Sequence, residues 1–185
     1  MIPKHLRPRL KFLQSLPVCA PPSPWEKVGT HAVGGLIDVG FETDSDLLLV
    51  LSSGNGRGVF DCLNGARVGR DYDQDYPFNT QSLIADSMPP MREPKIRTAG
   101  LHGGGLAKGT EDGWHIEKDP TLWPHSNLYL FSGFQRLFWK REGENDQVTK
   151  VASDSGEVRV FGFSPTGRSF IVAYSSDLEI YSRKL

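Results

Sequence analysis

The chain has 185 residues and a formal net charge of −1 at pH 7, with 38% hydrophobic and 23% charged residues. This length suits one ordinary domain with its own core, and the hydrophobic content is too high for a disordered chain. A net charge near zero excludes a strong overall field for nucleic acid or anionic membranes, so we expect any charged partner to be recognised locally.

The sequence gives no indication of a disulfide framework, a metal centre or a membrane segment. Cys19 and Cys62 are the only cysteines, too few to hold a chain of this size together or to form a zinc site. The basic start is followed by a short, interrupted apolar stretch, unlike that of a signal peptide. No stretch approaches the ~20 apolar residues of a membrane span. We therefore expect a cytoplasmic protein without a cofactor.

Residues 1–24 are predicted to form an N-terminal arm, followed by a single β domain over residues 25–185. Three leucines of the arm can share one helical face, although prolines stop any long helix. The leucines are Leu6, Leu10 and Leu13. Two interpretations stay open, a loosely held terminus or a short docking helix with a basic face for a protein partner or RNA. Outside this arm, nothing in the sequence favours nucleic acid.

Short apolar runs separated by turn residues predict a four-stranded antiparallel meander after the arm. The expected strands lie at 36–41, 47–51, 58–62 and 66–71. Asn64-Gly65 can supply the positive φ angles of a tight hairpin turn between the last two of them.

The middle of the chain is less regular. Residues 72–99 are rich in Asp and Pro, which predicts a long surface excursion with one helical turn near residues 81–85. Two further strands are expected at 127–131 and 134–140, divided by Ser132-Gly133.

The end of the chain repeats the first meander with a shift of 122 residues, which aligns Gly40 with Gly162 and Val50 with Val172. We therefore expect two equivalent units, at 35–71 and 157–183. The last strand, 178–183, is expected to complete a sheet near the chain start. The predicted core residues recur at matched positions of the paired strands. They are Phe41, Leu48, Val50, Phe161, Phe163, Phe170 and Val172.

A family resemblance lies in residues 160–181, where an apolar strand, the turn Ser164-Pro165-Thr166-Gly167 and a second apolar strand follow one another. This pattern resembles the middle of a blade in WD40-type β-propellers, and residues 39–61 resemble a second copy. The Gly-His and Trp-Asp dipeptides of that family are absent from the sequence, and its length holds about four repeats of ~40–45 residues. The residues predict an all-β fold of antiparallel meanders, and the resemblance implies a small propeller-like assembly. A β-sandwich or a partly open barrel is the alternative.

The loop from Gly100 to His125 is the first candidate for a binding surface, because it concentrates glycines, aromatic residues and histidines on a predicted sheet. Its string His-Gly-Gly-Gly is also typical of the oxyanion hole of lipases and esterases, but the Gly-x-Ser-x-Gly of such enzymes is absent from the sequence. The candidate binding residues are His102, Gly103, Gly104, Gly105, Asp112, Trp114, His115 and Trp123.

These observations favour a non-enzymatic module that binds another protein, such as an inhibitor or immunity-type protein. No residue is assigned a catalytic or metal-binding role. The alternative is a small hydrolase or metal-dependent enzyme, in which His102, Asp112 and His115 meet in a pocket formed by loop 100–125.

Overall fold

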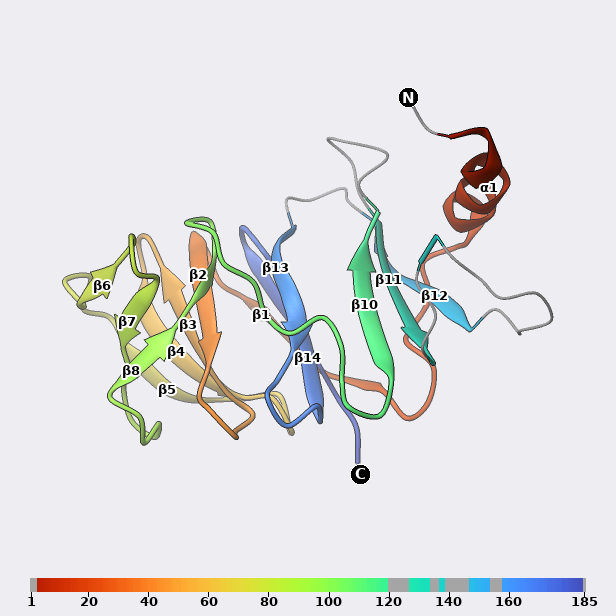
Figure 1. Cartoon of the computed structure of the whole chain (residues 1–185). Coiled ribbons are helices and arrows are strands. Elements are labelled where there is room, and N and C mark those ends of the chain that lie inside the picture. The colour runs from red at the N-terminus through yellow and green to blue at the C-terminus, as the bar shows by residue number, and fades with distance from the viewer. Residues whose placement is uncertain (1–2, 120–126, 134–136, 139–146, 154–157, 185) are drawn as a thin grey trace. The chain divides into compact units, whose positions relative to one another are not determined.

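The fold is mostly β-sheet. The computed structural model describes residues 3–119, 127–133, 137–138, 147–153 and 158–184. In this part of the chain the strands form four antiparallel sheets, with one short α-helix near the N-terminus (Figure 1). The all-β fold expected from the sequence is therefore confirmed. Of the described helices, none is long and apolar enough to cross a membrane.

Contacts within the chain divide it into two compact units. The first unit combines residues 1–23 with residues 108–156, and the second combines residues 24–107 with residues 157–185. The boundary after Ser23 lies next to the end of the predicted arm, whereas the boundary after Ala107 falls inside the loop 100–125. The candidate binding residues of that loop are thus shared between two units.

The first unit consists of a three-stranded sheet and a helix packed on it. The strand order is β10-β11-β12. The elements are η1 (Lys4–Leu6), α1 (Arg7–Ser15), β10 (Trp114–Lys118), β11 (Asn127–Ser132) and β12 (Val148–Ser153). The strand expected at 127–131 is confirmed as β11, whereas most of the strand expected at 134–140 lies outside the described residues.

Helix α1 docks on the sheet of its own unit through its apolar face. Leu10 and Leu13 are buried, and Leu13 packs in one cluster with Tyr129 and Phe131. The Tyr129 hydroxyl donates a hydrogen bond of 3.0 Å to the Leu13 carbonyl oxygen. Burial raises the pKa of Tyr129 to about 12, so the phenol stays protonated and keeps this donor. The arm therefore contains a helix that packs on the chain's own sheet, and its docking to a protein partner or RNA stays a prediction.

The second unit contains the other three sheets. The first has the order β1-β15-β14-β13 and is formed by β1 (Glu26–Ala32), β13 (Val158–Phe163), β14 (Ser169–Tyr174) and β15 (Asp177–Ser182). The second has the order β5-β4-β3-β2-β9 and is formed by β2 (Leu36–Phe41), β3 (Leu47–Ser52), β4 (Gly56–Asp61), β5 (Ala66–Asp71) and β9 (Ala99–Gly100). The third is β6 (Phe78–Asn79), β7 (Ile84–Asp86) and β8 (Lys95–Arg97). Because β15 pairs with β1, the prediction that the last strand completes a sheet near the chain start is confirmed.

Residues 72–99 differ from the expected surface excursion. The helical turn predicted near residues 81–85 is wrong, because this segment is a turn followed by strand β7. Ala85 and Ile96 are buried in a cluster with Leu49 and Leu51 of β3. Burial of these two apolar residues stabilises the small sheet β6-β7-β8. This burial depends on long-range contacts, which the Asp- and Pro-rich composition of the segment does not indicate.

The hairpins β2–β3 and β13–β14 share one register. Val39 pairs with Val50, and Phe161, which lies 122 positions after Val39, pairs with Val172. Each hairpin has an irregularity after its first residue pair, at matching positions. This identity supports the interpretation of the two segments as equivalent units. Five of the predicted core residues are buried, whereas Phe41 and Phe161 are only partly buried.

A hairpin formed by residues 97–107, here called the central hairpin, lies between β2 and β13. One arm continues β8 into β9, which pairs with β2, and the other arm bridges from Ala107 to Phe163 of β13. In Figure 1 this green segment runs past β2 and on to β13. The central hairpin therefore connects strands of two different sheets, β2 and β13.

Two glycines allow the central hairpin to lie directly against β2 and β13. A Cβ at Gly40 would collide with the Arg97 carbonyl oxygen, and a Cβ at Gly162 would lie 2.6 Å from the Ala107 carbonyl oxygen. Gly162 also has φ = 151°, which disfavours any side chain. These are the two glycines that the sequence repeat aligns, and each lies where one arm of the central hairpin meets a strand, β2 for Gly40 and β13 for Gly162.

A buried carboxylate joins the same two sheets on the side of their turns. Asp46, in the turn between β2 and β3, is only 6% exposed. It accepts hydrogen bonds from the hydroxyl of Thr166 at 2.7 Å and from that of Ser169, the first residue of β14, at 2.6 Å. Both oxygens of the buried carboxylate therefore have partners, as burial of such a group requires.

Replacing Gly40 by Ala tests the close approach of the central hairpin. We expect Gly40→Ala to lower the free energy of unfolding by about 1–3 kcal/mol, because the added methyl group has no room against the Arg97 backbone. Gly54→Ala is the matched control, since nothing lies within 4 Å of its added methyl group; its change should stay within about 0.5 kcal/mol. Urea unfolding of both variants measures the difference. Equal effects in the two variants would contradict this packing.

Candidate functional site

His102 and its three following glycines form the tip of the central hairpin. The amides of Gly100 and Gly103 each donate to the carbonyl oxygen of the other residue, at 2.8 and 3.2 Å. The His102 Nδ1 atom lies 2.5 Å from Oδ2 of Asp38, a residue of β2 whose side chain is fully buried. The string His-Gly-Gly-Gly therefore forms a tight turn that His102 anchors to β2.

Asp112 lies in the first unit and stabilises the turn that precedes β10. The Thr110 hydroxyl donates to Oδ1 of Asp112 at 2.6 Å and accepts the backbone N–H of Trp114 at 3.0 Å. Thr110 N–H in turn donates to the Trp114 carbonyl oxygen at 2.9 Å. Asp112 thus acts on Trp114 through Thr110, as a residue that positions the start of β10.

His115 follows on β10 and packs against its neighbouring strand. Its ring stacks on Phe131 of β11, with 5.6 Å between the ring centroids. Trp123 lies outside the described residues. His102, Asp112 and His115 therefore each have a partner within their own unit, and the enzyme with these three residues in one pocket stays a prediction.

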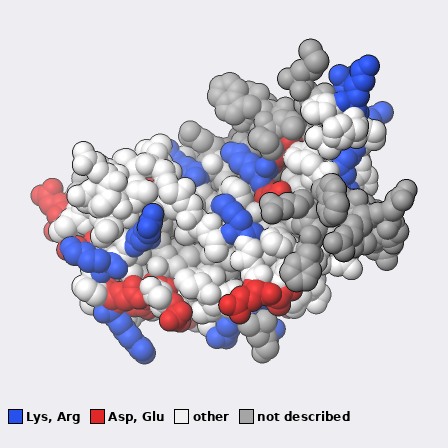
Figure 2. All heavy atoms as spheres, viewed as in Figure 1, with Lys and Arg blue, Asp and Glu red and all other residues white. Residues whose placement is uncertain are grey.

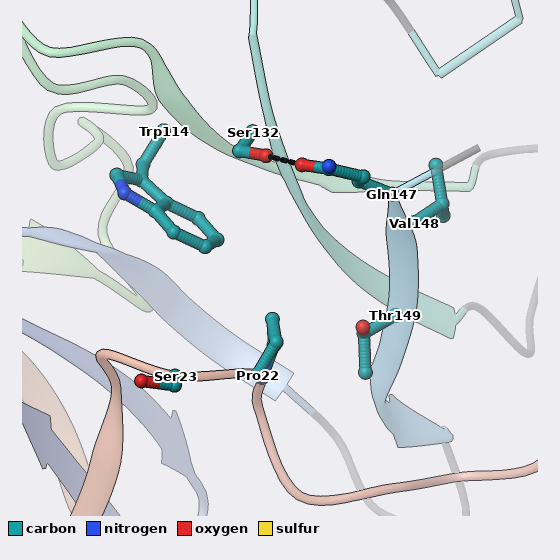
Figure 3. Close-up of a pocket in the computed structure, with 7 residues that line it drawn as sticks. All are labelled: Pro22, Ser23, Trp114, Ser132, Gln147, Val148 and Thr149. Atoms are coloured by element: carbon teal, nitrogen blue, oxygen red, sulfur yellow. Dashed lines mark hydrogen bonds between the residues drawn. The ribbon is translucent and has the colours of Figure 1, made fainter. Parts of the chain in front are cut away.

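Trp114 lines an open cavity of about 350 Å³ in the first unit, here called the Trp114 groove. Figure 3 shows the residues around it, with the indole on one side, Thr149 on the other and Pro22 below, while the Val148 side chain points away from the indole. The complete lining is Pro22, Ser23, Trp114, Ser132, Gln147, Val148 and Thr149.

The register of the three strands explains why these residues meet. Trp114 pairs with Ser132, and Thr149 of β12 pairs with Leu130 of β11. The Ser132 hydroxyl is hydrogen-bonded to the side chain of Gln147, which directly precedes β12 (Figure 3). One end of the sheet therefore carries an aromatic ring beside a row of short neutral polar side chains.

Pro22 and Ser23 reach the groove from the segment that follows α1. This segment is attached to β12, because Val18 forms a parallel bridge with Lys150 and Cys19 N–H donates to the Lys150 carbonyl oxygen at 2.9 Å. The segment that carries α1 is thus part of the site. Its proline adds an apolar surface to the lining, opposite a strand end that the sequence places more than 120 residues later.

The groove is chemically neutral. None of its seven described lining residues carries an acidic or basic side chain. Its hydroxyl and amide groups can donate and accept hydrogen bonds, while Trp114 and Pro22 offer apolar surface. Across the described residues, no group of three or more His, Cys, Asp or Glu side chains is placed to hold a metal ion. This arrangement is suited to binding a neutral group rather than to acid–base chemistry.

Sequence reasoning found Trp114 but missed its neighbours. Ser132, Gln147 and Thr149 belong to the site only because β11 and β12 pair in one particular register, and Pro22 only because its segment returns to β12. The one usable signal was Ser132-Gly133, which marks a strand end and hence a sheet edge at which loops gather.

The visible surface carries charges of both signs. Figure 2 shows Lys and Arg atoms and Asp and Glu atoms on it, with uncharged areas between them. With a net charge of −1, recognition by long-range attraction is weak. Local shape and hydrogen bonding therefore indicate a binding site more strongly than charge does.

No protein-family model matches the sequence, and no curated protein matches it. The resemblance to WD40-type propellers stays a prediction, and the function proposed below rests on the fold and the groove.

Replacing Thr110 by Val tests how the Trp114 groove is held. The variant loses the hydroxyl that accepts the Trp114 N–H, so we expect this amide to exchange with solvent faster and the free energy of unfolding to fall by about 0.5–1.5 kcal/mol. Thr43→Val is the control, because Thr43 is exposed. Amide hydrogen exchange measures the effect at the residue itself. Unchanged exchange at Trp114 would show that the turn does not depend on Thr110.

Proposed function

We propose that the chain is a non-enzymatic protein-binding module and that the Trp114 groove is where it holds its partner. The observation that carries the proposal is the pairing of one indole with a neutral, hydrogen-bonding wall. Tryptophan gives a large rigid contact area, and it is enriched among the residues that dominate protein interfaces.

The lining matches an extended polypeptide segment. Its apolar part, Trp114 with Pro22, provides a place for one apolar side chain of the partner. Its polar part, which includes Ser132, Gln147 and Thr149, offers donors and acceptors for the partner's backbone amides. The same combination of rigid aromatic anchors and adaptable small polar side chains is used by antibody paratopes.

A binder of this kind works by occupying its partner, as an inhibitor or immunity-type protein does. The hydrogen bonds that hold Trp114 before any partner arrives favour this role, because a preorganised anchor loses less freedom on binding. The groove also lies at the end of a sheet whose other side is fixed by α1, so the scaffold beneath it is packed.

We also infer that the second unit is built from repeated propeller-type units. The shared register of β2–β3 and β13–β14, and the pairing of β1 with β15, support this inference. In repeat assemblies, a strand from one part of the chain can complete a sheet formed by another part, and this pairing protects the sheet edge.

Trp114→Ala is the direct test of the binding site. We expect it to weaken the affinity for the partner by about tenfold or more, because the anchor of the interface is lost. The partner is first identified by affinity capture with the wild-type chain from its native cells, and the affinities are then measured with purified proteins. Tyr72→Ala is the matched control: Tyr72 is 74% exposed, lies in the second unit, and loses an aromatic ring in the same way.

Two results would contradict the proposal. The first is a partner that binds Trp114→Ala as tightly as the wild type. The second is a groove that binds neutral oligosaccharides with Trp114-dependent affinity while no protein partner depends on Trp114. A thermal unfolding midpoint close to that of the wild type shows that any lost affinity is not a consequence of unfolding.

A further inference from the structure

The central hairpin opens into a second cavity, in the other unit from the Trp114 groove. This cavity has a volume of about 300 Å³, and we call it the hairpin pocket. Its apolar lining includes Phe41 from the end of β2, Leu106 from the hairpin, Phe163 from the end of β13 and Pro165 from the following turn. Arg97, on the first arm of the hairpin, also lines it.

The pocket exists because the two arms of the hairpin separate. At the tip, Gly100 and Gly103 are hydrogen-bonded to each other. Further along, the arms bond outward instead: Thr98 N–H donates to the Leu83 carbonyl oxygen, and the Ala107 carbonyl oxygen accepts from Phe163 N–H, both at 2.8 Å. Each arm is thus held by a different neighbour, and the space between them is the hairpin pocket.

The walls of the pocket are fixed before any ligand arrives. Gly40 lets the Arg97 backbone lie directly against β2, and Gly162 lets Leu106 lie directly against β13. A Cβ at Gly162 would be only 2.6 Å from the Cβ atom of Leu106. Because these walls are already ordered, the pocket loses little conformational entropy when a ligand binds.

One basic residue, Arg97, lines this apolar pocket. Arg97 is exposed and is the only charged residue among the described residues that line the pocket. It makes no ion pair within the described part of the chain. The neighbouring Thr98 hydroxyl is already engaged, since it donates to the Leu83 carbonyl oxygen at 3.2 Å. The guanidinium is therefore the polar group available to orient a ligand.

We propose that the hairpin pocket binds a carboxylate that carries an aromatic or branched alkyl group. The guanidinium of Arg97 forms two parallel hydrogen bonds to the carboxylate, a geometry to which its planar fork is suited. The apolar body of the ligand lies against Phe41, Leu106 and Pro165. Both a free small acid and the C-terminal residue of a polypeptide have this chemistry.

The test is a titration with hydrocinnamate, followed by amide NMR on the full chain. We expect shifts at Leu106, Ala107 and Phe41, and a loss of affinity of about tenfold or more in Arg97→Gln, because a charge-assisted pair is removed. Arg67→Gln is the matched control: Arg67 is exposed on β5, an edge strand of the β5-β4-β3-β2-β9 sheet, does not line the pocket, and its replacement changes the net charge equally. It should bind as the wild type does.

Uncharged hydrocinnamamide tests the role of the carboxylate, and we expect it to bind at least about tenfold more weakly than the acid. A peptide ending in Phe with a free or an amidated C-terminus separates the two sources of the ligand. Tighter binding of the free-terminus peptide assigns the pocket to polypeptide C-termini, and binding of the acid alone assigns it to small molecules. The proposal is overturned if none of these probes binds, if the amide binds as well as the acid, or if Arg97→Gln binds like Arg67→Gln.

Discussion

The second unit depends on backbone lying directly against backbone. Two strands from different sheets, β2 and β13, each meet one arm of the central hairpin, and both contacts require glycine, at positions 40 and 162. With a side chain at either position the arm would be displaced, and the two sheets would lose the segment that connects them. The same contact sets the tip of the hairpin, where His102 is anchored to Asp38, and its open end, where the hairpin pocket lies. The requirement for glycine at these two contacts therefore positions both the tip of the central hairpin and the hairpin pocket.

The first unit is organised by pairing register and by one small hydrogen-bonded turn. Register brings Trp114, Ser132 and Gln147 to one end of a sheet, and the turn from Thr110 to Trp114 holds the start of β10. Helix α1 covers the opposite side of the unit's core through Leu13 and Tyr129. The neutral lining of the groove and its single partly buried indole then favour recognition of a protein segment over chemistry. A rigid scaffold that carries its binding residues at a sheet end is a common arrangement in binding proteins.

The sequence predicted the elements whose signal is local. Strands β2, β3, β13 and β14 are apolar runs bounded by turn residues, and the sequence predicted all four. The sheet β6-β7-β8 was not, because Ala85 and Ile96 are buried only through contacts with β3. The role of His102 was also beyond local reasoning, since its partner Asp38 lies 64 residues away. Trp114 could be singled out as a large aromatic residue in a glycine-rich loop, whereas its groove depends on strand pairing that no local pattern in the sequence specifies.

The indole N–H signals in an NMR spectrum test the central claim, that the Trp114 groove holds the partner, most directly. The sequence has four tryptophans, and replacement of each by Phe assigns the four signals. Trp25 serves as the internal reference, because it is buried in an aromatic cluster with Phe163 and Phe170 in the second unit. We expect that adding the captured partner shifts the Trp114 signal and leaves that of Trp25 in place. A complex in which the Trp114 signal is unchanged would contradict it.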